Sequence, residues 1–178
     1  MTTDQRRAIL LTLMGRLREQ GSWCGETHVQ KAAYFLQEMM DVPLDLNVIL
    51  YLHGPYSADI SAELSTLRAD LLLDVVPRDP RYGPSLTPTH SAGQLTNQFP
   101  KTITKYAPAI SFIAGKFGHM NVKELERLST AHWIMRRDPS LLDDEIVAEL
   151  VRIKPHIPPD AARQAIRDVR QIEAEVET

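Results

Sequence analysis

The sequence predicts a mainly helical protein, in which a winged-helix-like N-terminal half with a short strand and a β-hairpin is followed by a bundle of additional helices. Apolar residues recur with helical periodicity in most of the long segments. The first half has the order helix, helix, strand, helix, hairpin, which is typical of a winged-helix elaboration of helix-turn-helix. The second half shows helical periodicity only. We therefore expect a single domain, 1–178, made of halves 1–88 and 89–178.

Two helices are expected at the start of the chain. Residues 4–20 form the first, and Gly21 suits the position just after a helix end. Its apolar face consists of Leu10, Leu13, Met14 and Leu17. The second helix, 28–40, is expected to follow Thr27 as its N-cap, and Lys31 is expected to point away from its apolar stripe.

A strand, a sharp turn and a third helix are expected next. The strand candidate, Val48–His53, carries apolar groups on both sides, so we expect it to be covered on both. Gly54 can adopt backbone angles closed to other residues, and Pro55 fixes its own φ. Ser57 is placed as the N-cap of a helix over 58–69. Gly54, Pro55 and Ser57 are therefore expected to act structurally.

The remaining elements are a hairpin and further helices. The hairpin strands are expected at 72–76 and 85–87, joined by a long loop rich in proline. The later helices are expected at 89–98, 101–117, 122–137, 141–152 and 160–176.

Composition limits the compartment and the chemistry of the protein. The one cysteine, Cys24, cannot form an internal disulfide, which favours a reducing cytoplasm. There is neither a secretion signal nor an apolar run long enough to span a membrane, so no membrane partner is expected. No histidine lies at metal-binding spacing from another ligand, and no phosphate-binding glycine loop occurs. We expect no catalytic residues, no metal and no cofactor.

The charge distribution bears on nucleic-acid binding. The predicted helix 58–69 carries Asp59 and Glu63 against Arg68 alone, which is the wrong sign for approaching phosphates. The hairpin loop offers Arg78 and Arg81 but also Asp79. Specific duplex binding through this surface is therefore disfavoured. The basic segment 101–137, with seven basic and two acidic side chains, is a second-choice surface for nucleic acid.

Two surfaces are candidates for binding a protein partner. The first is the turn with Tyr51, His53 and Tyr56, because loop aromatics on a rigid scaffold often carry recognition. Packing within the turn is an equally good explanation of these residues. The second surface is the acidic helix with Asp143, Asp144, Glu145 and Glu149, which could imitate phosphates in the basic site of a toxin. It ranks second because such clusters are usually only solvated.

Several motifs resemble one family of bacterial proteins. Lys31-Ala32-Ala33-Tyr34-Phe35-Leu36 resembles the K-x-x-Y helix of the YwgA-like and Panacea (SocA-like) proteins. The turn from Tyr51 to Ser57, YLHGPYS, is similar to their Y-x-x-G-P-[YV]-[SA] turn. The segment from Leu125 to Trp133, LERLSTAHW, is similar to part of the C-terminal domain of DarG-type antitoxins, with serine at 129 where alanine is usual. Ile153-Lys154-Pro155-His156 also resembles a family feature.

The resemblance implies a non-enzymatic protein of toxin–antitoxin or phage-defence loci. Such domains bind a toxin directly or present it to a protease, so we expect an antitoxin or adaptor with a protein partner. The family supplies no catalytic residue, and the macrodomain of DarG-type proteins is lacking from this sequence. The alternative is a winged-helix transcriptional regulator that binds DNA. A homo-oligomer is compatible with both functions.

Overall fold

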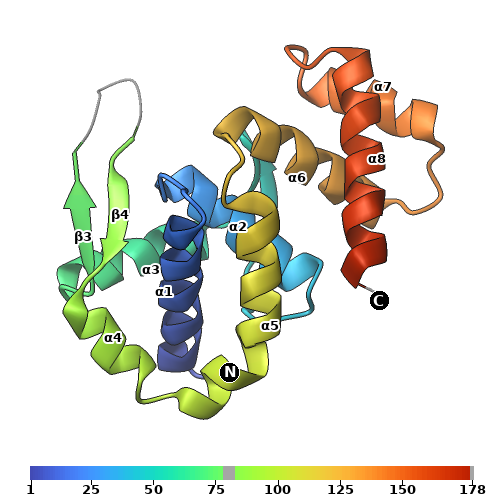
Figure 1. Ribbon diagram of the computed structural model, residues 1–178. Coiled ribbons are helices and arrows are strands. Elements are labelled where there is room, and N and C mark those ends of the chain that lie inside the picture. The colour runs from blue at the N-terminus through green and yellow to red at the C-terminus, as the bar shows by residue number, and fades with distance from the viewer. Residues whose placement is uncertain (78–82, 177–178) are drawn as a thin grey trace. The chain divides into compact units, whose positions relative to one another are not determined.

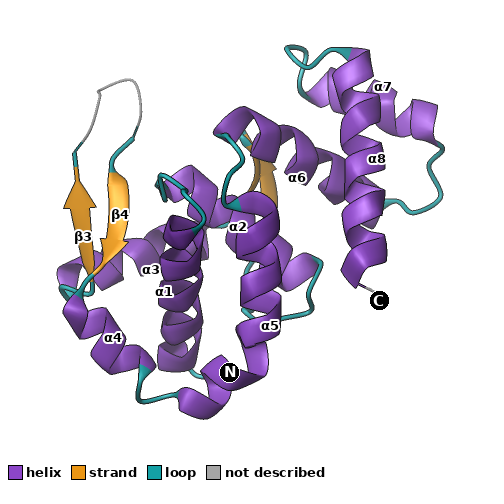
Figure 2. Ribbon diagram, viewed as in Figure 1, coloured by secondary structure: helices purple, strands orange, loops and turns teal. Residues whose placement is uncertain are grey.

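The chain is mainly helical, as predicted. The computed structural model describes residues 1–77 and 83–176. Within these ranges it contains eight helices and two small antiparallel hairpins, β1–β2 and β3–β4 (Figure 2). The predicted class, mainly α with a minor β component, is therefore confirmed, while the winged-helix likeness stays a prediction.

The chain divides into two compact units. The first contains Met1–Ile49 and Tyr56–Met120, and the second contains Leu50–Pro55 and Asn121–Thr178. These bounds differ from those of the predicted halves, because the helices that follow residue 88 up to Met120 pack with the first helix. That the whole chain is a single domain stays a prediction.

The first unit is built around its N-terminal helix, α1 (Figure 1). Helix α1 buries a stripe of apolar side chains that includes all four predicted residues, and it packs against α2, α4, α5 and β4. Its helices are α1 (Thr3–Glu19), α2 (Glu26–Glu38), α3 (Ala58–Ala69), α4 (His90–Thr96) and α5 (Pro100–Phe117).

Two expectations for α2 are wrong. Its N-cap is Gly25 rather than Thr27, which lies inside the first turn. Lys31 is among the most deeply buried large side chains of the protein, instead of pointing away from the apolar stripe. The long aliphatic stem of a lysine allows it to take a place among apolar neighbours, so the apolar pattern alone did not reveal its position.

The predicted hairpin is confirmed. Strands β3 (Leu73–Val76) and β4 (Ser85–Pro88) pair antiparallel, with Leu73 opposite Pro88 and Val76 opposite Ser85. The other side of β4 is held by the segment between α1 and α2, since the Leu86 N–H donates to the Cys24 carbonyl over 3.0 Å. The predicted loop residues Arg78, Asp79 and Arg81 lie outside the described residues.

The first strand differs from its prediction. Residues 49–56 form a two-stranded hairpin, β1 (Ile49–Tyr51) and β2 (Gly54–Tyr56), where a lone strand was expected. The strand is not covered on both sides, because Ile49 and Tyr51 remain 57% and 56% exposed. A short loop closed by a glycine at positive φ, as here at Gly54, is a common hairpin geometry.

The second unit consists of three helices and the 50–55 segment. Helices α6 (Val122–Arg137), α7 (Asp143–Ile153) and α8 (Pro159–Val176) pack against one another (Figure 1). The predicted N-cap Asn121 accepts hydrogen bonds from the N–H groups of Lys123 and Glu124, both over 3.0 Å. Its own N–H donates to the Glu124 carboxylate, which completes a capping box.

Candidate functional site

The turn between β1 and β2 exposes large apolar side chains. Tyr51 is 56% exposed, Leu52 is 67% exposed, and His53 is also exposed. We call Tyr51–His53 the exposed turn. No lysine, arginine, aspartate or glutamate occurs over residues 46–58. The exposed turn therefore presents apolar side chains in a stretch without acidic or strongly basic residues, and clustered apolar exposure of this kind marks interaction sites more often than a scattered leucine does.

A buried lysine holds the backbone of this turn. The Lys154 ammonium donates to the Tyr51 carbonyl over 3.1 Å and to the Leu52 carbonyl. It also forms an ion pair with the Glu126 carboxylate, 3.0 Å from Nζ to Oε1. The two charged side chains are only 5% and 8% exposed. The ammonium therefore donates to two carbonyl groups of the exposed turn, while the Glu126 carboxylate supplies the opposite charge.

The same region of α6 supports the turn at Gly54. Gly54 has a φ of +89°, and a Cβ placed there would lie 2.9 Å from Thr130 Oγ1 and 3.2 Å from Ser129 Oγ. The Thr130 hydroxyl is itself fixed, since it donates to the Glu126 carbonyl over 2.7 Å. Glycine is therefore required at residue 54 both for its backbone angle and for its lack of a side chain.

Segments far apart in the sequence meet at this site. The turn motif, the α6 motif with Glu126, Ser129 and Thr130, and the Lys154-Pro155-His156 motif all contribute to it. His156, which is largely exposed, lies 3.5 Å from the second oxygen of Glu126. Three of the motifs in the family resemblance thus have one structural explanation: they build and support the exposed turn.

Tyr56 and Ser57 are engaged differently from the exposed turn. Tyr56 belongs to the first unit, where its hydroxyl donates to Ser61 Oγ over 3.0 Å. Ser57 occupies the predicted N-cap position of α3, but its side chain accepts no hydrogen bond from the helix, contrary to expectation. Gln30 fixes Ser57 instead: its amide accepts from the Ser57 N–H over 3.0 Å and donates to the Ser57 carbonyl over 2.9 Å.

The four predicted acidic residues are all engaged within the second unit. Asp143 pairs with Arg170 of α8 over 2.9 Å, and Asp144 pairs with Arg163 over 3.1 Å. The other two carboxylates are engaged locally, Glu145 with the Leu142 N–H over 2.8 Å and Glu149 with Arg152 over 2.6 Å. A phosphate mimic needs uncompensated negative charge, and Asp143, Asp144 and Glu149 are each paired with an arginine, which weakens this hypothesis.

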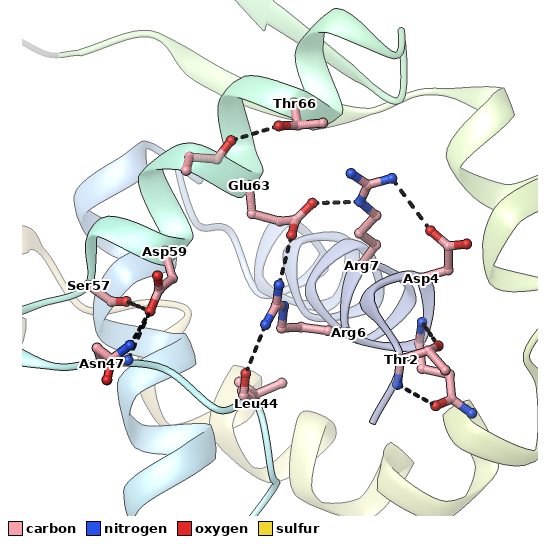
Figure 3. Close-up of polar contacts among 12 residues, drawn as sticks. Thr2, Asp4, Arg6, Arg7, Leu44, Asn47, Ser57, Asp59, Glu63 and Thr66 are labelled. Atoms are coloured by element: carbon pink, nitrogen blue, oxygen red, sulfur yellow. Dashed lines mark hydrogen bonds and ion pairs between the residues drawn. The ribbon is translucent and has the colours of Figure 1, made fainter.

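The acidic residues of α3 are likewise used internally (Figure 3). Glu63 is only 7% exposed and pairs with Arg6 over 3.2 Å and with Arg7 over 2.5 Å. Asp59 accepts from the Asn47 N–H over 3.0 Å. The exposed residues of α3 are Ala58, Ala62, Ser65, Thr66, Arg68 and Ala69. The charge argument against DNA binding by this helix is therefore weaker than the sequence indicated.

The buried titratable groups have structural roles. Burial lowers the pKa of His28 to about 4, and the imidazole bonds Ser22 Oγ and the Phe117 carbonyl. Burial also raises the pKa of the Cys24 thiol to about 12, which makes it a poor nucleophile. Within residues 1–77 and 83–176, no cluster of three or more histidine, cysteine, aspartate or glutamate side chains could hold a metal ion.

Sequence reasoning missed the supporting residues Glu126, Lys154 and Gln30. Each is a polar residue with less than about a tenth of its surface exposed, and hydrophobic periodicity does not reveal such residues. The available signal was that Glu126 and Lys154 lie within motifs of the resemblance. Their partners could be identified only once the fold had brought the motifs together.

Comparisons with known proteins do not assign a family to this chain. No protein-family model matches the chain, and no curated protein matches it at a significant level. Among the described residues, none of the helices combines the length and the apolar character that crossing a bilayer requires.

Proposed function

We propose that this chain is a non-enzymatic protein-interaction module that binds its partner through the exposed turn, Tyr51–His53. The observation that carries the proposal is the combination of outward apolar side chains with a backbone fixed by buried charges. Exposing Leu52 and Tyr51 to water is unfavourable for the free protein. A rigid aromatic and aliphatic projection is what a protein interface uses as its anchor.

The partner's binding surface should be an apolar pocket. The stretch 46–58 contains no lysine, arginine, aspartate or glutamate with which to complement a strongly basic or acidic site. The resemblance to the YwgA-like and Panacea (SocA-like) proteins supports an antitoxin, which covers a toxin directly, or an adaptor that presents it to a protease. A turn that inserts into an apolar pocket fits either role. The protein would be encoded in a toxin–antitoxin or phage-defence locus and would act in the bacterial cytoplasm.

The test compares two leucines of similar exposure. Leu52 is 67% exposed and Leu142, at the start of α7, is 71% exposed. A photo-crosslinking residue at each position in the native host first identifies the captured protein, which is then purified and titrated. We expect Leu52→Asp to weaken its binding at least about tenfold, as for an interface anchor, and Leu142→Asp to leave it unchanged.

Other outcomes would assign binding elsewhere. Equal binding by wild type and Leu52→Asp, with both proteins folded, would exclude the exposed turn. Replacing Asp143, Asp144 and Glu145 by Asn, Asn and Gln then tests the acidic surface, and Tyr56→Ala tests the first-unit end of β2. Loss of binding in the triple variant alone would support the phosphate-mimic hypothesis.

DNA binding is the second candidate function, and one observation favours it. The carboxylates of α3 are engaged by Arg6, Arg7 and Asn47, which leaves mainly small and hydroxyl side chains on its exposed face. Such a face can approach a duplex more closely than the sequence indicated. It supplies only Arg68 for phosphate contacts, so this function ranks below protein binding.

A further inference from the structure

The Lys154–Glu126 pair is hard to explain as a source of stability alone. Both side chains are more than nine-tenths withdrawn from water. Removing two charges from water offsets most of their mutual attraction, and apolar replacements of buried pairs are often neutral or stabilising. A buried pair is therefore better explained by a geometry that it specifies than by net stability.

The geometry specified here is that of the exposed turn. The ammonium takes the carbonyl oxygens of two consecutive residues, Tyr51 and Leu52, and so fixes the orientation of two neighbouring peptide planes. The carboxylate of Glu126 lies 3.0 Å from the ammonium and supplies the opposite charge. Apolar side chains could fill the same space but could not accept or donate these bonds.

The lysine is itself held at a fixed place. Lys154 is the C-cap of α7, where its N–H donates to the Leu150 carbonyl over 2.8 Å. Its own carbonyl accepts from the Ile157 N–H over 2.9 Å, so the backbone on both sides of the residue is tied down. Because the backbone of Lys154 is fixed at the end of α7, its side chain can hold the turn at a fixed position relative to that helix end.

We propose that Lys154 and Glu126 are positioning residues, which hold the exposed turn in the conformation that presents Leu52 and Tyr51. This assignment rests on the proposed function for what the presented side chains do. Whether the ammonium holds the turn in place can be tested separately, without any partner. Pre-organisation of this kind increases affinity by lowering the ordering cost of binding.

The experiment separates positioning from stability by a double substitution. Lys154→Met removes the ammonium that pairs with the buried Glu126 carboxylate, so both global stability and the order of the turn should decrease. Lys154→Met combined with Glu126→Gln removes both charges, which should restore the unfolding midpoint. Amide hydrogen exchange over residues 50–54 should nevertheless remain about tenfold faster than in the wild type, because the bonds of the ammonium to the two carbonyls are still missing.

The outcomes distinguish this proposal from its alternatives. If the double variant restores both the unfolding midpoint and the slow exchange of 50–54, the pair is only structural and the proposal is overturned. Arg152→Met is the matched control, since it breaks the exposed ion pair of the same helix and should change neither quantity. Fast exchange in the double variant together with unchanged partner binding would support the positioning role and contradict the proposed function.

Discussion

At the scale of single residues, Gly54 and Gly21 offer a matched pair. Their φ angles are +89° and +86°, both in the left-handed region that favours glycine. A side chain at Gly21 would meet nothing within 4 Å, whereas one at Gly54 would meet Thr130 and Ser129 within 3.2 Å. Both glycines adopt a positive φ that disfavours other residues, and only at Gly54 would a side chain also be too close to its neighbours.

Alanine substitution should separate the two requirements. Gly21→Ala is expected to reduce the free energy of unfolding by about 1–2 kcal/mol, the cost of the left-handed conformation. Gly54→Ala should cost more, because the hydroxyls of α6 must also move. Urea denaturation of both variants measures the difference. Equal losses would mean that α6 does not constrain the turn.

The two buried histidines make stability depend on pH. Burial lowers the pKa of His28 and of His132 to about 4, from 6.5 in an unfolded chain. Between pH 6.5 and pH 4 the unfolded state therefore binds more protons than the folded state. Stability is fully present above pH 6.5 and is lost as the pH falls toward 4.

Acidification should accordingly destabilise the protein before its carboxylates titrate. We expect a loss of roughly 2 kcal/mol per histidine between pH 7 and pH 5. Urea unfolding at pH 7, 6 and 5 measures this loss, and His28→Gln should reduce it by about half. A free energy of unfolding that stays constant from pH 7 to pH 5 would show that neither histidine is held neutral.

At the scale of elements, α1 and α3 end in the same way with different residues. After α1, the N–H groups of Gly21 and Ser22 donate to Arg18 and Leu17. After α3, those of Leu71 and Leu72 donate to Arg68 and Leu67 in the same pattern. Both ends are Schellman motifs, whose left-handed position usually holds glycine. At the end of α3 this position holds Leu71, with a φ of +57° and 75% exposure.

Replacing Leu71 by glycine should stabilise the protein. The substitution relieves the left-handed strain and loses little burial, so we expect a gain of about 0.5–1 kcal/mol. Leu71→Ala is the control, because it removes the side chain and keeps the strain, and it should give no such gain. Thermal melts of the two variants measure the difference in stability. A lower melting temperature for Leu71→Gly than for the wild type would show that packing of the leucine side chain outweighs the relief of strain.

At the scale of the whole molecule, the charge balance predicts weak binding to nucleic acid. The formal net charge is −3, and the exposed face of α3 has one basic side chain. Titration with random and native-promoter duplexes at about 150 mM salt, where charges are screened over about 8 Å, should give no tight specific complex. A nanomolar complex that depends on sequence would promote the DNA-binding candidate over protein binding.

The basic segment 101–137 is divided by the fold. Lys101, Lys105 and Lys116 belong to the first unit, while Lys123, Arg127, Arg136 and Arg137 belong to the second. Helix α5 directs two of its lysines over its own aromatic rings, Lys105 over Tyr106 and Lys116 over Phe112. The basic residues of segment 101–137 are therefore divided between the two units and do not form a single surface of either one.

Local patterns in the sequence were enough to predict the helices and their approximate ends. Periodic apolar residues predicted α1 and α6, and Asn121 and Gly21 marked a start and an end correctly, because caps and periodicity are local properties of the chain. The β3–β4 hairpin was predicted for the same reason. The exposure of β1 was not, since periodicity does not tell which apolar residues the fold leaves uncovered.

The tertiary structure alone decided which charges are buried and which residues form the candidate site. Tyr51 and His53 could be chosen from the turn motif, but the role of Lys154 depends on acceptors about a hundred positions away in the chain. Glu63 and Asp143 appeared as free negative charges until the fold paired them with Arg7 and Arg170. Coulomb interactions act through space and not along the chain, so their partners are fixed only when the helices have packed.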